Sequence, residues 1–208
     1  MTWQGRSTPL VHRTTDSPVG LLVIVASDRG LVRIDYGSRT FAREITRSGL
    51  SGWSSPTTDP EVTTPADRIL DETEKQLAEY FAGQRKSFSL PLDLLPSLPA
   101  PDHKPGTPEM DPQENIPNPW ISQQGNFRSA VQLSLQTIPY GETKSYGEMA
   151  EIVGAPRAAR AVGSACATCP LPIVLPCHRV TRSDGSLGEY AGGRHVKKAL
   201  LELERRFA

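Results

Sequence analysis

The stretch Pro170-Leu-Pro-Ile-Val-Leu-Pro-Cys-His-Arg-Val180 carries the strongest structural and chemical information in this sequence. Its three prolines exclude a helix, and its apolar side chains predict a buried, extended segment. The segment delivers Cys177 beside His178, and a histidine can take the proton that turns a thiol into a nucleophile. In an extended chain these neighbours point to opposite faces, so contact requires a backbone turn or a bridging water. The alternative is a buried cysteine that packs as a small apolar side chain.

Around this stretch, length and composition describe a globular protein. The chain has 208 residues, 37% of them hydrophobic, and its 23 basic and 23 acidic residues cancel. That length allows one domain or two small ones, and the apolar content excludes global disorder. Residues 125–208 hold 11 Lys and Arg against 7 Asp and Glu, a balance of +4. Such an excess is compatible with a polyanionic partner, but it is also common on solvated surfaces.

Membrane and secretory classes are not favoured. The longest apolar run, residues 21–26, is far short of the roughly 20 residues that a membrane-spanning helix needs. The first residues lack the basic start and apolar stretch of a secretory signal. Three cysteines do not make a disulfide framework in a chain of this length. We therefore expect a soluble cytoplasmic protein with reduced thiols.

The N-terminal part predicts strands followed by a helix. The β-branched segment 19–26 and the alternating segment 31–36 flank the turn signal of residues 28–30, a pattern typical of a β-hairpin. Residues 64–67, Thr-Pro-Ala-Asp, place a capping residue, a proline at the first helical position and an acid at the third. Apolar side chains continue at helical spacing until Gly83, where we expect the helix to end.

Nine prolines lie between Pro91 and Pro119. No periodicity survives there, which predicts an exposed, largely disordered or polyproline-like linker over residues 95–121. The predicted organisation is a strand-rich α/β domain at 1–94, this linker, and a helical domain at 122–208.

The C-terminal part predicts a set of short helices. Residues 126–136 are amphipathic, and Ser145 with Glu148 forms a capping box that opens a helix ending at Gly154. Pro156 is expected to start a further helix over residues 157–165, giving a helix-turn-helix. The last predicted helix spans residues 196–205, with Val196, Leu200 and Leu203 on one face.

Four motifs in this part of the chain occur in a fixed order. They are Ile138-Pro-Tyr-Gly-Glu-Thr-Lys-Ser-Tyr-Gly-Glu148, Arg160-Ala-Val-Gly163, Pro172-Ile-Val-Leu-Pro-Cys-His-Arg-Val180 and Gly185-Ser-Leu-Gly-Glu-Tyr-Ala-Gly-Gly193. Together they closely resemble the O6-alkylguanine-DNA alkyltransferase family, over residues 127–204. The resemblance implies an α+β protein that repairs DNA by direct reversal, without an organic cofactor or a metal.

The resemblance also implies roles for individual side chains. Cys177 would accept the alkyl group from guanine O6, and His178 would draw off the thiol proton through a water. Glu204 would orient the imidazole, which is triad logic in the order Cys, His, Glu. Tyr146 would donate a proton or a hydrogen bond to the leaving guanine. The alternatives are a core-packing Tyr146 and a Glu204 that pairs with surface charges.

The same resemblance implies the contacts with duplex DNA. The helix carrying Arg160 would enter the minor groove, and Arg160 would fill the gap left by the extruded nucleotide; a solvated arginine is the alternative. The remaining residues implied in DNA binding are Arg157, Ala161, Gly163 and Tyr146. Those implied in the base pocket are Val180, Tyr190, Ala191 and Pro172. The expected partner is double-stranded DNA containing O6-alkylguanine, bound by a monomer in the nucleoid of a prokaryote or the nucleus of a eukaryote.

Two positions depart from the family pattern. Cys169 stands where the family usually has Asn, which adds a second thiol near Cys177. Gln132 stands where a Trp is often found, and we interpret this as a surface change. A non-catalytic alkylguanine-sensing DNA-binding protein is one alternative function. A redox or zinc sensor built on Cys166, Cys169 and Cys177 is another.

Overall fold

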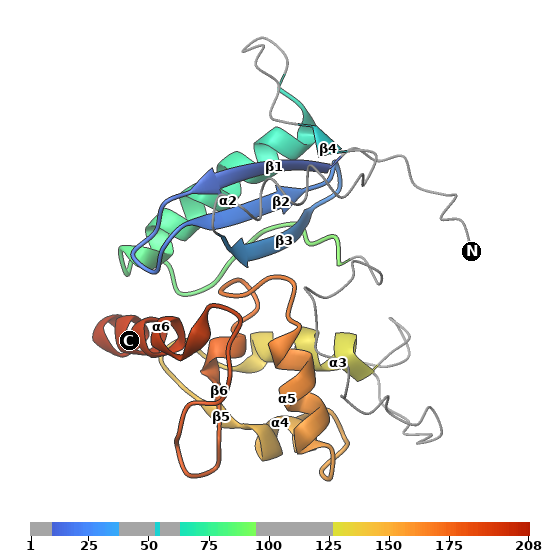
Figure 1. The fold of residues 1–208 in the computed structure, drawn as a ribbon, viewed down its shortest axis with the longest axis vertical. Helices are drawn as coiled ribbons and strands as arrows, with labels where there is room; N and C mark the ends of the chain where they lie inside the picture. The colour runs from blue at the N-terminus through green and yellow to red at the C-terminus, as the bar shows by residue number, and fades with distance from the viewer. Residues whose placement is uncertain (1–9, 38–52, 55–62, 95–126) are drawn as a thin grey trace, which may run out of the picture. The chain divides into compact units, whose positions relative to one another are not determined.

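The computed structural model describes residues 10–37, 53–54, 63–94 and 127–208. The chain divides into two compact units, Met1–Leu95 and Pro96–Ala208. The first contains a sheet with a helix and the second is mainly helical (Figure 1), so the predicted α+β class is confirmed. The predicted linker at 95–121 lies outside the described residues. Within the described part of the chain, no helix has both the length and the apolar character needed to cross a membrane.

The sheet of the N-terminal unit has the strand order β3-β2-β1-β4. Its strands are β1 (Leu10–Thr15), β2 (Leu22–Ala26), β3 (Leu31–Tyr36) and the short β4 (Trp53–Ser54). The first three pair antiparallel, and β4 runs parallel to β1. The predicted hairpin is therefore confirmed as β2–β3. All five residues of β2 are buried, as expected for a continuous apolar strand at the centre of a sheet.

Helix α2 (Pro65–Phe81) packs on β1, β2 and β3 (Figure 1). It begins at the predicted capping box: the Thr64 hydroxyl accepts from the backbone N–H of Asp67, and the Asp67 carboxylate accepts from that of Thr64. These bonds satisfy backbone donors that the first turn leaves without helical partners. At the other end Gly83 has φ of 73°, which glycine adopts without steric cost. Both ends of the helix are thus encoded locally.

The C-terminal unit packs its helices around one apolar core (Figure 1). Its elements are α3 (Phe127–Ser134), η1 (Leu135–Thr137), β5 (Lys144–Ser145), α4 (Tyr146–Ile152), α5 (Ala159–Ala167), η2 (Cys177–Arg179), β6 (Val180–Thr181) and α6 (Gly193–Phe207). Helices α3 and α4 both pack against α5. The capping box of Ser145 and Glu148 is present at the start of α4, so this predicted helix start is confirmed.

Two details of the predicted helices are wrong. Helix α5 begins at Ala159, because Pro156 and Arg157 form a turn closed by the bond from the Ala158 N–H to the Ala155 carbonyl at 2.8 Å. On α6, Leu203 is only half-buried. The fully buried face carries two charged residues instead, Lys197 and Glu204. Charged side chains are almost never fully buried unless they are paired, so this face of α6 is built for polar contacts.

Candidate active site

The chain turns sharply before Cys177. Pro172 and Leu175 form an isolated bridge, and the Leu175 N–H donates to the Leu171 carbonyl at 2.8 Å. Ile173, between them, has φ of 75°, an unusual conformation for a β-branched residue that costs on the order of 1–3 kcal/mol. Burial of the apolar side chains of this turn offsets that cost. The predicted extended conformation is therefore wrong, because tertiary packing overrides the local preference.

The turn leads into the 3-10 helix η2, which starts at Cys177. His178, the second residue of η2, is fully buried and its Nε2 lies 2.7 Å from Glu204 Oε1 on α6. Glu204 is also fully buried. The predicted neighbours are thus brought together although they stand 26 residues apart in the sequence. The alternative of a surface-paired Glu204 is wrong.

Arg179 completes this buried network. Its guanidinium donates to both carboxylate oxygens of Glu204, at 2.9 to 3.2 Å, and to the Ile138 carbonyl at 2.6 Å. The Gly141 N–H adds a further bond to Glu204 Oε2 at 3.0 Å. A buried carboxylate is stable only when its oxygens are satisfied in this way. Arg179 therefore fixes the acid that holds the imidazole.

The protonation states of the pair follow from these contacts. Burial disfavours the Glu204 carboxylate, but the hydrogen bonds from His178 and Arg179, together with the positive charge of Arg179, outweigh burial and lower the pKa of Glu204 to about 2. Burial also lowers the pKa of His178. At neutral pH an ionised Glu204 only accepts hydrogen bonds, so Nε2 of a neutral His178 carries the hydrogen. The other ring nitrogen, Nδ1, is then the basic one.

Cys177 is buried in contact with a second thiol. The hydrogen bond between its side chain and Cys169 is the largest cause of a pKa raised well above the ordinary value, followed by burial. The positive charge of Lys197 acts in the opposite direction. The Cys177 sulfur is therefore a protonated thiol in the protein without DNA. It must lose its proton to become a nucleophile.

Tyr146 is carried to the same place by a short parallel ladder. Strand β5 pairs with β6 through Lys144 opposite Val180 and Ser145 opposite Thr181, and Tyr146 follows β5 directly as the first residue of α4. Cys177 lies near enough for its charge to act on the Tyr146 hydroxyl. The Tyr146 hydroxyl contacts Gly188 where any side chain would collide with it. Burial raises the pKa of Tyr146 to about 12. The phenol is therefore protonated at neutral pH and is available as a donor.

Lys197 is the functional candidate that the sequence prediction missed. Its Nζ donates to the Val180 carbonyl at 2.6 Å and lies 5.8 Å from the centre of the Tyr146 ring. Burial lowers its pKa, while the neighbouring cysteines raise it. A signal was present, because Lys197 stands seven residues, or two helical turns, before Glu204 and so shares its buried face.

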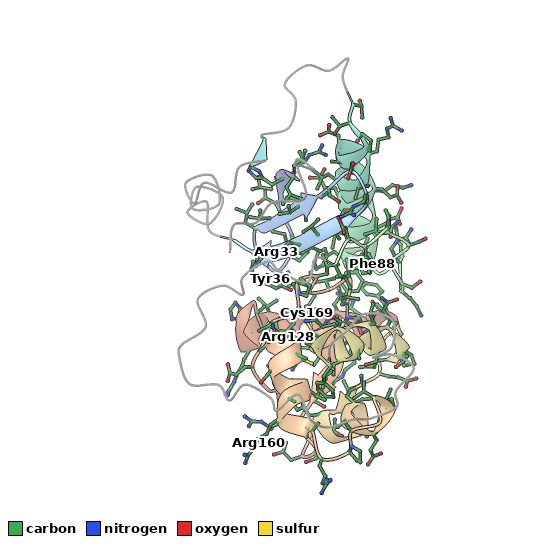
Figure 2. The ribbon with its side chains drawn as sticks, turned by 90° about the vertical axis from the view of Figure 1, so that its right-hand side faces the viewer. Arg33, Tyr36, Phe88, Arg128, Arg160 and Cys169 are labelled. Carbon is green, nitrogen blue, oxygen red and sulfur yellow. The ribbon has the colours of Figure 1, made fainter. Side chains whose placement is uncertain are left out.

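The predicted DNA-contacting residues lie on or next to α5. Arg157 and Arg160 are exposed, whereas Ala161 and Gly163 are half-buried. Arg160 extends away from the body of its unit, at the opposite end of α5 from Cys169 (Figure 2). The Gly163 Cα faces the Tyr146 ring, where an added Cβ would lie 3.8 Å away. The exposed Arg157 and Arg160 thus lie in the turn before α5 and in its first turn, whereas Gly163 lies on the side of α5 that faces Tyr146.

The four residues assigned to the base pocket differ in their surroundings. Tyr190 is buried and its ring lies edge-on to that of His178, with 6.3 Å between the centres. Ala191 is exposed beside it, at the start of the loop into α6. Val180 and Pro172 are buried, and the Val180 carbonyl is occupied by Lys197. Tyr190 is therefore the one of the four with a ring contact to the imidazole.

Known proteins match the chain along almost its whole length. Residues 10–94 match the family model of the 6-O-methylguanine DNA methyltransferase ribonuclease-like domain, and residues 126–206 match that of its DNA binding domain. The methylated-DNA–protein-cysteine methyltransferase of Mycolicibacterium paratuberculosis is 38% identical over 195 residues, covering 94% of this chain and 92% of its own. The chain belongs to the methylated-DNA–protein-cysteine methyltransferase family.

Two further members bear on the comparison. The constitutive methyltransferase of Bacillus subtilis is 33% identical over 93% of this chain and 94% of its own. The crystal structure of Mycobacterium tuberculosis OGT in complex with DNA superposes with a TM-score of 0.67 at 35% identity, covering 95% of this chain and 94% of that one. The resemblance stated from the motifs is therefore confirmed, and it extends to the N-terminal unit.

Relative to the usual family pattern, Gln132 is not a surface change. It is buried on α3, and its Nε2 donates to the carbonyls of Ala165 at 3.1 Å and Thr168 at 3.3 Å. These carbonyls lie at the C-terminal end of α5, where helical partners are missing. Gln132 thus holds the chain immediately before Cys169. The prediction failed because a polar residue type was equated with exposure.

The three cysteines do not form a metal centre. All are buried thiols, and no group of three or more His, Cys, Asp or Glu among the residues described could hold a metal ion. The zinc-sensor alternative therefore has no ligand set in this part of the methyltransferase fold. The absence of a ligand set does not bear on the redox chemistry of Cys169 and Cys177.

Replacing Gln132 with Ala is expected to destabilise the protein by about 1–3 kcal/mol, because the carbonyls of Ala165 and Thr168 both lose the buried Gln132 amide as a donor. Urea unfolding followed by circular dichroism measures the change. Gln136→Ala is the matched control, since Gln136 is exposed on η1 and its loss should stay within about 0.5 kcal/mol. Equal stabilities of the two variants would contradict the role given to Gln132.

Proposed function

We propose that this protein repairs O6-alkylguanine in double-stranded DNA by transferring the alkyl group irreversibly to Cys177. The observation that carries the proposal is the buried network in which Glu204 holds His178 directly next to Cys177. Family membership supports the same reaction, as does the similarity to a relative crystallised in complex with DNA. We propose that the protein acts as a single-turnover methyltransferase.

The first step is activation of the thiol. Nδ1 of His178 takes the Cys177 proton through a water, and the imidazolium that results is stabilised by the Glu204 carboxylate behind it. The positive charge of Lys197 favours the thiolate. Because the resting thiol is protonated, we infer that the proton leaves only when the alkyl carbon is presented.

The second step is displacement at the alkyl carbon. The Cys177 sulfur forms a bond to that carbon while the bond from the carbon to guanine O6 breaks. Negative charge develops on the departing oxygen, and the protonated phenol of Tyr146 is proposed to donate to it. The raised pKa of Tyr146 supports this assignment, since the donor stays protonated at neutral pH. Guanine is released unmodified.

The third element of the proposal is access to the base. The target oxygen lies inside the base stack, so the nucleotide must be flipped out at a cost of a few kcal/mol. We propose that α5 enters the minor groove of the DNA and that Arg160 fills the space left by the extruded nucleotide. Arg157, Ala161 and Gly163 are proposed to contact the DNA backbone. Tyr190, Ala191, Val180 and Pro172 are proposed to surround the extruded base.

The product explains the stoichiometry. A thioether is a poor leaving group, so each molecule would repair one lesion and then be spent. The chemistry needs no organic cofactor or metal, and a monomer suffices. We propose the nucleoid, within the cytoplasm, as the place of action in a prokaryote. We further propose that residues 1–94 and 122–208 are domains joined by the proline-rich segment.

The proposal is tested by counting repaired bases. The protein is incubated with excess duplex DNA carrying one O6-methylguanine, and the O6-methylguanine left after digestion is quantified. One lesion lost per protein molecule is expected. Multiple turnovers would contradict the single-use mechanism. Unchanged lesions with tight binding would instead identify an alkylguanine sensor, and unchanged lesions without binding would leave only a thiol sensor.

Arg160→Ala is expected to slow methyl transfer about 10²-fold, because the extruded state loses the side chain that compensates the few kcal/mol of unstacking. Single-turnover transfer rates on the same duplex measure it. The matched control is Arg157→Ala, which removes an exposed arginine next to the same helix and should weaken binding like one lost phosphate contact, reducing the salt slope by about 1. An unchanged transfer rate in Arg160→Ala would count against the finger role.

A further inference from the structure

Two thiols meet at the centre of the C-terminal unit. Cys169, two residues beyond the end of α5, and Cys177, the first residue of η2, are in hydrogen-bonding contact through their side chains. They are separated by only eight positions, and the tight turn at residues 172–175 folds the chain back between them.

The third cysteine is placed differently. Cys166 lies within α5, and it influences Cys177 only through charge, without a hydrogen bond to it. Its position one turn before Cys169 forms the C-x-x-C pattern, but α5 holds Cys166 in regular helix while Cys169 lies outside it. The structure thus separates the sequence pair Cys166–Cys169 from the spatial pair Cys169–Cys177. Only the second pair is in side-chain contact through a hydrogen bond.

A disulfide would require a small movement of one of the two cysteines. A disulfide needs the sulfurs about 2.05 Å apart and suitable Cβ positions, so one cysteine must move slightly from its hydrogen-bonded position. Cys169 is held by the longer backbone hydrogen bond of the two. Its N–H bond to the Cys166 carbonyl is 3.3 Å long, whereas that of Cys177 to Leu175 is 2.7 Å. Cys169 is also the more exposed of the two, at 7% against 1%.

We propose that Cys169 and Cys177 form an oxidant-sensitive modification site, in which a peroxide converts the two thiols into a disulfide. In the first step hydrogen peroxide oxidises the Cys169 sulfur by two electrons to a sulfenic acid and is itself reduced to water. In the second step the Cys177 sulfur attacks that sulfur, the S–O bond breaks, and a second water leaves with the Cys177 proton. The protein loses two hydrogens in total, and a dithiol reductant reverses the change.

The consequence concerns the alkyl acceptor. In the disulfide the Cys177 sulfur has no nucleophilic electron pair to offer as a thiolate, so the oxidised protein would accept no alkyl group. Disulfide formation is reversible, whereas oxidation of Cys177 to sulfinic or sulfonic acid is not. Cys169 would therefore keep the acceptor recoverable under peroxide stress. Formation of the disulfide itself is independent of the proposed repair activity, and only the loss of transfer depends on it.

The test follows the mass of the full-length protein during a hydrogen peroxide titration without DNA. The wild-type protein should lose two hydrogens, and peptide mapping should place the link between Cys169 and Cys177; dithiothreitol should restore the mass. Cys166→Ser is the matched control and should behave like wild type. Cys169→Ser should instead gain oxygen atoms on Cys177 and should not recover.

Two results would overturn the proposal. One is a wild-type protein that only gains oxygen atoms, and the other is a link that includes Cys166. Methyl transfer from O6-methylguanine duplex, measured before oxidation, after oxidation and after reduction, then follows the consequence for the acceptor. A disulfide-linked protein that still transfers would refute the use of Cys177 as acceptor and leave the disulfide standing, so the two failures are distinguishable.

Discussion

Cys177→Ala is expected to abolish methyl transfer completely while leaving the affinity for duplex DNA unchanged. The substitution removes the sulfur that forms the new bond, and the methyl side chain of alanine cannot act as a nucleophile. Because Cys177 lies in the buried interior and the arginines proposed to contact DNA are exposed, binding should not depend on it. Transfer is followed as radiolabelled methyl carried from DNA to protein, and binding as a gel shift on the same duplex.

The matched control for this variant is Cys166→Ala. It removes another buried thiol from the same unit, but one without a hydrogen bond to Cys177. Transfer in this control should stay close to that of the wild type. Residual methyl transfer by Cys177→Ala, with label on Cys166 or Cys169, would contradict the assignment of the acceptor.

Glu204→Gln is expected to be the most destabilising of the single changes considered. It removes the negative partner of a buried guanidinium, and breaking a buried pair in this way costs about 3–5 kcal/mol. It also removes the group that holds His178 as a base, so transfer should fall by about 10²–10⁴-fold. Urea unfolding and single-turnover kinetics measure the two effects separately.

Glu202→Gln provides the control for the second prediction. Glu202 lies two residues away on the exposed side of α6, where it pairs with Lys198 at 3.7 Å. A surface pair contributes about 0–1 kcal/mol, so this variant should be nearly as stable as the wild type. If both variants lost the same stability, the buried network would not have the importance given to it.

Acid titration supplies a further signature of the same network. Both His178 and Glu204 have lowered pKa values in the folded protein, so the unfolded chain binds more protons at acidic pH. The contribution of His178 should be lost as the pH falls below its ordinary pKa of 6.5, and that of Glu204 between 4.5 and about 2. The free energy of unfolding of Glu204→Gln should therefore depend less on pH below 4.5 than that of the wild type.

Local signals in the sequence were sufficient for much of the fold. The capping boxes at Thr64 and Ser145 involve contacts between residues three positions apart, so their patterns alone predict where helices start. The β2–β3 hairpin follows in the same way from its turn residues. The proximity of Glu204 to His178 came from the family resemblance, because no local rule connects residues 26 positions apart.

The failures share one physical cause, which is burial set by the rest of the fold. Ile173 takes a backbone conformation that its own side chain disfavours, because the surrounding core holds it there. Lys197 and Gln132 are polar residues that can be buried because each donates a hydrogen bond to a backbone carbonyl of another element. From residue type alone, such side chains are predicted to be exposed. Their burial depends on contacts with elements that are distant in the sequence.

The central claim is that the alkyl group becomes covalently bound to the Cys177 sulfur. Mapping the adduct tests this claim most directly. The wild-type protein is reacted with duplex DNA that carries isotopically labelled O6-methylguanine, digested, and sequenced by tandem mass spectrometry. A single labelled methyl on the peptide containing Cys177, with unmodified Cys166 and Cys169, is the result we predict. A labelled methyl on any other side chain, or fully repaired DNA with an unlabelled protein, would contradict the account.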